Sequence, residues 1–423
     1  MRKNLIFIFV LIFSLLLFSV MVMAEEVTIR FMGWEASPLE TQSILNGIKV
    51  FEERNQGVKV EYTPVAQEQY ISKLLTMMAG GTAPDVFFLE SNTYRDVAAR
   101  GELLDLTDLV EDEIGIDSFI LLAQDKMLID GRIYGVSSCT VSPVLYYNKD
   151  LFDKAGVPYP PADPEEAWTW NEFVDVAKKL TIKEGGRTQQ YGVFGFQKFW
   201  YTTVFSNGGE VFNEDYTEVL VNQPKAQEAI QKIVDLRKIH SVAPEGNFLE
   251  QSGMNTAQML QTGRVAMVVD GTWALQELAT MDFPVGMAVL PKLENTITCG
   301  QAHLHCVWTG SKHKDIAWKF TKFLSSTEYQ LDLVKSGLWM PNRKDMYTEE
   351  GIEEWFTPGV HPENFRDLVP YILNARLEPN VKVPRKVWDI LTMEELEKIW
   401  FADQPVEVVT ETIVERVNPL LKN

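Results

Sequence analysis

Cysteine is scarce in this chain of 423 residues, which contains only three. Three cysteines are too few for a disulfide scaffold, and an odd number leaves at least one thiol unpaired. Positive charge is also scarce, because 39 Lys and Arg stand against 59 Asp and Glu, giving a formal net charge of -20. Nucleic acids and anionic membranes attract clustered Lys and Arg, so this balance argues against both as partners. No low-complexity tract is present, and a hydrophobic content of 46% is typical of a globular protein.

The first 24 residues have the pattern of a secretory signal. Arg2 and Lys3 precede an apolar run from Leu5 to Met23, and the small residue Ala24 follows at a plausible cleavage point. The run is long for a signal peptide and just short of a comfortable membrane span, so an uncleaved anchor stays open as an alternative. No Cys lies near the cleavage point, which argues against a lipoprotein. We therefore expect residues 1–24 to be a signal peptide and the protein to be periplasmic or extracellular.

Strand and helix patterns alternate at the start of the mature chain. Residues 27–34, 58–65 and 84–90 are compact apolar stretches that predict strands, and the segments 37–57 and 68–81 between them have helical spacing. This order predicts a parallel α/β sheet, in which ligands bind beyond the carboxyl ends of the strands. Those ends lie at Trp34-Glu35, at Val65 to Gln67 and at Glu90-Ser91.

A second α/β unit follows without a flexible linker. Residues 190–196 and 263–273 predict buried strands, and residues 225–240 and 408–421 predict helices. The joins between the two units are strand-like rather than rich in Gly and Ser. We therefore expect two α/β lobes connected by short hinges, with the ligand cleft between them.

The order of several longer motifs resembles a known family. These motifs include "GGTAPDVFFLE", "DGRIYGVS" with "LYYNKDLFDKAGV", "WTWNEFVDVAKKLT", "FSNGGEVFNED", "MLQTGRVAMVVDGTWALQEL" and "SGLWMPNRKD". Together they are similar to the extracellular solute-binding proteins of carbohydrate ABC importers, of the maltose-binding type, over essentially the whole mature chain. The resemblance implies a type II periplasmic-binding-protein fold that closes on a sugar like a hinge and presents it to a membrane permease.

The resemblance also implies where the chain crosses between lobes. The crossings would lie near Ser137 to Tyr146, Val289 to Cys299 and Leu338 to Arg343. Lobe 1 would then comprise residues 25–139 plus 292–338, and lobe 2 residues 140–291 plus 339–423. A monomer is expected, partnered by the transmembrane permease subunits of the importer, with no cofactor and no catalytic residues.

Sugars offer flat apolar faces edged with hydroxyls, so their sites combine aromatic rings with carboxylates, amides and Arg. The alternative is that each Trp packs in the core and each carboxylate caps a strand or helix. We consider as aromatic platforms Trp34, Trp200, Trp273, Trp339 and Trp388, the last because the resemblance implies an aromatic in that region. The polar candidates are Glu35, Gln67, Glu90, Ser91, Asn207, Asp270 and Arg343.

The stretch "CGQAHLHCVW", Cys299 to Trp308, looks by residue count like a metal site. On an extended strand, however, side chains alternate, so Cys306 would point away from His303 and His305. A disulfide between Cys299 and Cys306 would have to span about 20 Å on such a strand, against a limit of about 7 Å. A bend at Gly300 would reopen either alternative. We favour a strand that directs His303 into the cleft, with His305 and Gln301 on the same face as further candidates. A neutral imidazole there both donates to and accepts from a hydroxyl.

These observations favour a secreted carbohydrate-binding receptor of an ABC importer. Two alternatives stay open: a secreted glycoside-processing enzyme that uses Glu35 and Glu90 as an acid and base pair, and a receptor for a peptide, metal or polyamine on the same fold. The sequence does not predict whether the sugar is a monosaccharide or an oligosaccharide.

Overall fold

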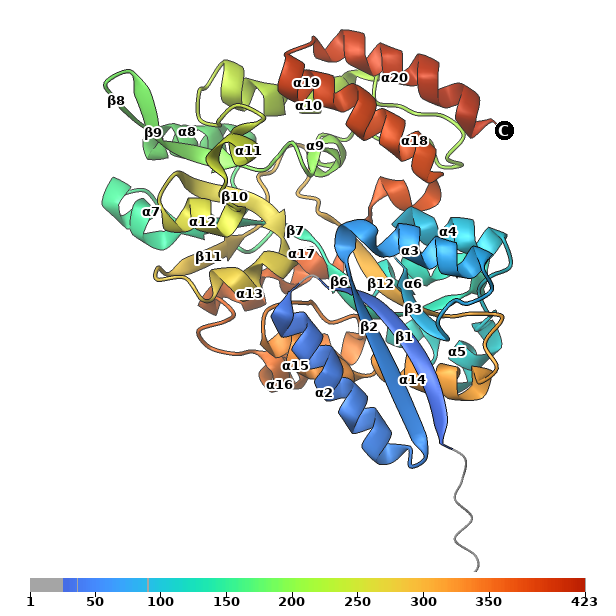
Figure 1. Cartoon of the computed structure of the whole chain (residues 1–423). Helices are drawn as coiled ribbons and strands as arrows, with labels where there is room; N and C mark the ends of the chain where they lie inside the picture. The colour runs from blue at the N-terminus through green and yellow to red at the C-terminus, as the bar shows by residue number, and fades with distance from the viewer. Residues whose placement is uncertain (1–25, 36, 90, 423) are drawn as a thin grey trace, which may run out of the picture.

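Two separate sheets organise the protein, and Figure 1 shows them side by side with helices around each. The computed structural model describes residues 26–35, 37–89 and 91–422. In the first sheet the strand order is β13-β12-β3-β1-β2, and β6 also pairs with β12. Its strands are β1 (Val27–Glu35), β2 (Val58–Ala66), β3 (Val86–Leu89), β6 (Gly135–Val141), β12 (Cys299–Val307) and β13 (Arg376–Leu377).

The first half of this sheet follows the sequence prediction. β1 pairs in parallel with both β2 and β3, so the three strands end at one edge of the sheet. α2 (Pro38–Arg54) begins where Ser37 Oγ accepts a hydrogen bond from Glu40 N at 3.1 Å, with Pro38 in the first helical turn. It buries Ile44, Ile48 and Phe51. The other helices beside the sheet include α3 (Gln67–Ala79), α4 (Ser91–Ala99), α6 (Leu121–Met127), α14 (Lys314–Leu324) and α15 (Thr327–Lys335).

The second sheet has the order β11-β7-β10-β9-β8. Here β10 is parallel to β9 but antiparallel to β7, so the sheet is mixed. Its strands are β7 (Pro143–Asn148), β8 (Ile182–Glu184), β9 (Arg187–Phe194), β10 (Val265–Gly271) and β11 (Val285–Ala288). Helices beside it include α8 (Trp170–Leu180), α9 (Trp200–Ser206), α10 (Pro224–Lys238), α12 (Thr256–Gln261), η2 (Thr272–Ala274) and α13 (Leu275–Leu278).

The segments that connect the two sheets are held together by hydrogen bonds. β6 of the first sheet leads directly into β7 of the second through Ser142, whose carbonyl accepts from Thr272 N at 2.9 Å. Where the chain returns toward β12, Thr298 Oγ1 donates to Pro143 O at 2.8 Å. After β13 the chain continues into α18 (Arg385–Asp389), the π-helix η6 (Ile390–Leu396), α19 (Glu397–Ala402) and α20 (Val406–Leu421).

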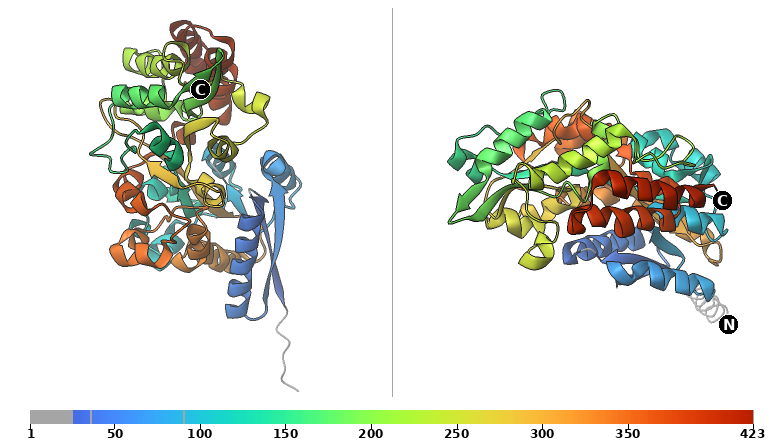
Figure 2. Two further views of the ribbon diagram at one scale, coloured as in Figure 1. Left: turned by 90° about the vertical axis from the view of Figure 1, so that its left-hand side faces the viewer. Right: turned by 90° about the horizontal axis from the view of Figure 1, so that it is seen from above.

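These C-terminal helices lie beside α10 of the second lobe, and both Figures 1 and 2 show the red helices there. The lobe boundaries expected from the sequence stay a prediction; within the second expected range, β13 pairs with β12 of the first sheet. The expected signal peptide, residues 1–24, lies outside the described residues. In the part of the chain that the structure describes, we find no helix with the length and apolarity that crossing a membrane requires.

Candidate ligand-binding cleft

Two adjoining hollows form a cleft in the protein. The first, which we call the strand-end hollow, has a volume of about 350 Å³, and the second, the helical hollow, has a volume of about 500 Å³. Both volumes lie within the range of about 300–1,000 Å³ that is usual for small-molecule sites. Trp273 and Gln301 line both hollows, so the two adjoin at these side chains.

The strand-end hollow lies where strands of both sheets end or begin. Its described lining residues are Trp34, Glu40, Gln67, Val141, Thr256, Asp270, Trp273, Ala274, Gln276, Glu277, Gln301, His303, Leu338 and Trp339. Trp34 is near the end of β1, Gln67 directly follows β2, and Asp270 is near the end of β10. Strand ends therefore position these side chains, as the sequence predicted for a parallel α/β sheet.

His303 lies among aromatic rings at the wall of the strand-end hollow. Its ring centroid is 5.4 Å from Trp34, 4.7 Å from Phe88 and 5.9 Å from Trp339, and only 9% of the residue is exposed. Burial, with the nearby charge of Lys126, lowers the pKa of His303 to about 3. The imidazole is therefore neutral near pH 7, with one nitrogen to donate and one to accept.

His305 lies deeper than His303 and does not line either hollow. Its ring packs between Phe31 at 5.5 Å and Phe88 at 6.0 Å, and burial lowers its pKa to about 3 as well. The register of β12 with β6 shifts between His303 and Leu304, where Ser138 of β6 is the extra residue, so β12 itself keeps its alternation. Both histidines therefore share a face and contact Phe88, but only His303 lines the strand-end hollow, because His305 is covered by Phe31.

The cysteine alternatives for this strand find no support in the described residues. Cys139, Cys299 and Cys306 are all free and buried, so the alternative of a Cys299–Cys306 disulfide is wrong. Burial raises the pKa of the Cys306 thiol above its usual range, which favours the protonated form. Among the described residues, no group of three or more His, Cys, Asp or Glu is arranged to hold a metal ion.

Asp270 and Lys198 meet where the two hollows join. Asp270 accepts from Thr256 Oγ1 at 2.5 Å and from Gly271 N at 2.8 Å, and Lys198 Nζ lies 3.5 Å from its Oδ1. The same ammonium lies 5.1 Å from the centre of the Trp273 ring. Trp273 folds back over Gly271, because a Cβ at position 271 would lie 2.2 Å from the indole. Gly271 is therefore required for the position of Trp273.

The helical hollow is built from aromatic side chains on helices. Its described lining residues are Gln197, Lys198, Phe199, Trp200, Tyr201, Gly246, Trp273, Gln301, Glu378, Asn380, Trp388, Thr392, Met393, Leu396, Glu397, Trp400 and Phe401. The rings of Trp200 and Trp388 are stacked, 6.2 Å apart and inclined by 19°. Tyr201 Oη donates to Glu378 Oε1 at 2.9 Å, and burial raises the pKa of Tyr201 so that its hydroxyl stays a donor.

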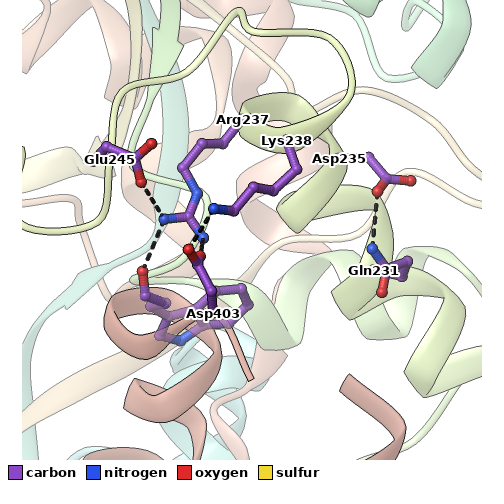
Figure 3. Close-up of polar contacts among 7 residues, drawn as sticks. Gln231, Asp235, Arg237, Lys238, Glu245 and Asp403 are labelled. Carbon is purple, nitrogen blue, oxygen red and sulfur yellow. Dashed lines mark hydrogen bonds and ion pairs between the residues drawn. The ribbon is translucent and has the colours of Figure 1, made fainter. Parts of the chain in front are cut away.

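Ion pairs hold the helices behind this hollow. Arg237 of α10 donates to Trp400 O at 3.2 Å, and Arg237 and Lys238 both pair with Asp403, as Figure 3 shows. Arg416 of α20 pairs with the buried Glu395 of η6. The segment that carries Trp400 is thus held to α10 by side chains rather than by a sheet.

The geometry of the cleft can now be compared with known proteins. The family model of the bacterial extracellular solute-binding proteins matches residues 36–331. The chain belongs to this family.

One similar solved structure is the ABC substrate-binding protein Lmo0181 from Listeria monocytogenes in complex with cycloalternan, with a TM-score of 0.82, 29% identity, and coverage of 94% of this chain and 99% of that one. A maltooligosaccharide ABC transporter solute-binding lipoprotein of Streptococcus pneumoniae is 24% identical and covers 80% of this chain and 76% of its own. An sn-glycerol-3-phosphate-binding periplasmic protein of Agrobacterium fabrum is 27% identical, covering 69% of this chain and 68% of its own. The fold is that of the type II periplasmic binding proteins.

Eight of the candidate site residues of this solute-binding protein line the cleft. They are Trp34, Gln67, Asp270, His303 and Trp339 in the strand-end hollow, Trp200 and Trp388 in the helical hollow, and Trp273 in both. Glu90 and the side chain of Ser91 lie outside the described residues.

Three other candidates lie away from both hollows, and each has a structural reason. Glu35 follows the buried Trp34 on a strand, so its side chain is exposed on the opposite face, where it accepts from Thr41. Asn207 ends α9, and its amide donates to Lys225 O at 2.8 Å. The guanidinium of Arg343 lies 4.6 Å from the centre of the Phe119 ring. None of the three lines either hollow, and a role for them in ligand binding stays a prediction.

The sequence reasoning missed most of the second lobe's contribution. Thr256, Gln276 and Glu277 come from short helices around the end of β10, and Lys198 and Tyr201 flank Trp200. Gln276 and Glu277 could have been predicted because they are close to Trp273 in sequence, and Lys198 and Tyr201 because they are close to Trp200. Met393 and Phe401 follow Trp388 along the C-terminal helices and had no such signal.

Proposed function

We propose that this solute-binding protein is the carbohydrate receptor of an ABC importer and binds an oligosaccharide in the cleft. The observation that carries the proposal is Trp273, an indole that lines both hollows beside the carboxylate of Asp270. An aromatic face next to a hydrogen-bonding carboxylate is what a pyranose ring with its rim of hydroxyls requires.

The extent of the aromatic lining favours an oligosaccharide over a monosaccharide. Trp34 and Trp339 line the strand-end hollow, and Trp200 and Trp388 line the helical hollow. Because Trp273 and Gln301 belong to both, one ligand could contact platforms in each hollow without a break. The ligands named for two of the similar proteins, cycloalternan and maltooligosaccharide, support this proposal.

Closure of the two lobes on the ligand is the expected capture step. Ser37 at the start of α2 lies beside the first sheet, and its Oγ donates to Gln276 Oε1 of the second lobe at 3.0 Å. A contact of this kind across the cleft forms or breaks as the lobes rotate about their connecting segments. The closed receptor would then present its ligand to the permease subunits.

The test is a glycan panel measured by thermal shift and isothermal calorimetry. We expect stoichiometric binding of at least one oligosaccharide, a higher melting temperature with ligand, and no hydrolysis of any glycoside. Small-angle scattering should give a smaller radius of gyration with the bound sugar. Turnover of a glycoside would instead support the enzyme alternative.

A thermal-shift measurement with zinc distinguishes a carbohydrate receptor from a metal-binding protein. If no sugar moves the melting temperature but zinc raises it, and His303→Ala abolishes the zinc effect, the carbohydrate proposal is wrong. We expect the reverse, with His303→Ala weakening sugar binding.

A further inference from the structure

Most of the charged side chains that line the cleft are acidic. Carboxyl side chains from both lobes line it, and the described ones are Glu40, Asp270 and Glu277 in the strand-end hollow and Glu378 and Glu397 in the helical hollow. Among the described residues that line the two hollows, Lys198 is the single Lys or Arg. The surrounding protein adds to this field, because its formal net charge is -20.

The one basic side chain already has partners within the protein. Lys198 Nζ lies 3.5 Å from Asp270 and over the rings of Trp273 at 5.1 Å and Phe199 at 5.2 Å. An anionic ligand group could engage this ammonium only by competing with the Asp270 carboxylate. Lys198 therefore does not provide a ready anion site.

The other basic group in the cleft carries no charge near pH 7. His303 is nine-tenths buried at the wall of the strand-end hollow, and burial lowers its pKa to about 3. It can serve a hydroxyl or an ammonium through its neutral nitrogens, but it cannot neutralise an anion.

We propose that the cleft selects saccharides by charge: neutral and amine-bearing saccharides are accepted, and saccharides that carry a carboxylate, phosphate or sulfate are rejected. The proposal rests on the carbohydrate function proposed above and specifies its substrate class. An anionic group in this cleft would lose its hydration and face several carboxylates in a partly desolvated site. An ammonium group would be attracted both by these carboxylates and by the faces of the indole rings.

The selection sets this receptor apart from one of the proteins that it resembles. The relative from Agrobacterium fabrum is named for binding sn-glycerol 3-phosphate, a dianionic ligand. A site for such a ligand needs basic side chains or free backbone amides aimed at the phosphate. The described lining residues of this cleft supply Lys198 alone, already paired with Asp270.

The experiment compares three ligands that differ in one group. They are the tightest-binding neutral trisaccharide of the panel, with maltotriose as the first probe, and its 6-amino-6-deoxy and 6-carboxylate forms at the terminal unit. Calorimetry measures the affinities at about 20 mM NaCl, where the Debye length is long and charges act over a distance, and at about 300 mM NaCl, where it is short. We expect the amine to bind at least as tightly as the neutral sugar and the carboxylate at least tenfold more weakly, with a smaller gap at high salt.

Variants locate the selection in the cleft. Glu277→Gln combined with Glu397→Gln removes one carboxylate from each hollow and should reduce the amine-to-carboxylate affinity ratio at least threefold. Glu184→Gln combined with Glu61→Gln removes two carboxylates from β8 and β2, away from the cleft, and should leave the ratio unchanged. Lys198→Gln should increase the ratio.

The outcomes separate the two proposals. If the carboxylate form binds as tightly as the amine or more tightly, the charge selection is wrong while the carbohydrate function stands. The charge selection is also wrong if Glu184→Gln combined with Glu61→Gln changes the affinity ratio as much as the double cleft variant does. If no trisaccharide binds in any form, the carbohydrate function fails and the selection fails with it.

Discussion

The two hollows of the cleft are built in different ways. The strand-end hollow takes one part of its walls from the ends of β1, β6 and β10 and from β12, whose backbones are fixed by sheet hydrogen bonds. Most of the rest comes from α2, α3, α12, η2 and α13. The helical hollow takes most of its walls from α9, α18, η6 and α19. Met393 and Phe401 in this second wall are 62% and 48% exposed, whereas Trp34 and His303 in the first are almost fully buried. We infer that the first hollow is rigid and the second is adaptable.

The π-helix η6 strengthens this contrast. Such helices are rare and are often found at functional sites. η6 supplies Thr392, Met393 and Leu396 to the helical hollow, and Arg416 holds it from behind through Glu394 and Glu395. A flexible thioether such as Met393 packs against varied apolar surfaces. A rigid hollow that recognises one sugar unit and an adaptable one that accepts variable extensions would suit an oligosaccharide receptor.

Replacing the platform that the two hollows share should have the largest effect. In Trp273→Ala both hollows lose a wall, and we expect sugar affinity to fall by about 2–3 kcal/mol, roughly 30-fold to 150-fold, as for an aromatic hot spot. Calorimetry measures the change. Trp308→Phe serves as the control, because Trp308 lines neither hollow and its Nε1 donates to Glu102. A loss below threefold in Trp273→Ala would mean that the ligand does not bridge the hollows.

Acid should destabilise the strand-end side of the protein in particular. Burial lowers the pKa of His303 and His305 from 6.5 to about 3, so below pH 6.5 the unfolded chain binds protons that the folded chain does not. The free energy of unfolding should therefore decrease as the pH falls from about 6.5 toward 3, by about 1.4 kcal/mol per pH unit for each histidine. Above pH 6.5 this contribution is constant.

Urea denaturation at a series of pH values measures this slope. His305→Phe keeps an aromatic ring between Phe31 and Phe88 and removes one titrating group, so it should reduce the slope by about 1.4 kcal/mol per pH unit. His313→Gln, at an exposed position, is the matched control and should leave the slope unchanged. An equal slope in His305→Phe and the unaltered protein would contradict the burial argument.

The contrast between the hollows also explains what the sequence could predict. The sequence could predict Trp34, Gln67 and Asp270 as cleft residues. A buried strand followed by a polar residue is a local pattern, and parallel strands end together at one edge of the sheet. Glu35 lines neither hollow, and strand alternation, which puts it opposite Trp34, accounts for this position. Alternation could not separate His305 from His303, because the Phe31 and Phe88 rings that cover His305 come together only in the packed sheet.

The helical hollow depends on contacts between distant parts of the chain. Trp200 and Trp388 stack across 188 positions of sequence, and Glu378 reaches Tyr201 across a separation of 177. Spacing along a helix does not reveal such pairings, and it does not distinguish η6 from an ordinary α-helix. The resemblance to a family pointed to Trp388, but nothing in the sequence pointed to Met393, Phe401 or the Arg416 pair behind them.

A change in the wall of the helical hollow should weaken the binding of long ligands more than that of short ones. Met393→Ala removes an exposed side chain, so we expect no change in melting temperature and a threefold to fivefold loss of affinity for the longest bound oligosaccharide, about 1 kcal/mol. A disaccharide should bind with unchanged affinity. Ile239→Ala, a similar truncation at an exposed position outside the cleft, is the control. Equal losses for short and long ligands would remove the distinction between the two hollows.

The contact across the cleft should have the smallest effect. Gln276→Ala removes the partner of Ser37 Oγ but leaves the N-cap bond of that hydroxyl to Glu40 N, so α2 keeps its start. One part-buried hydrogen bond of this kind contributes about 0.5–1 kcal/mol, so we expect affinity to fall by about twofold to fivefold. If Ser37 and Gln276 meet mainly in the closed state, stopped-flow binding should place this loss in the dissociation rate, and ligands of every length should lose affinity equally. A loss confined to the association rate would contradict this role of Gln276 in the closed state.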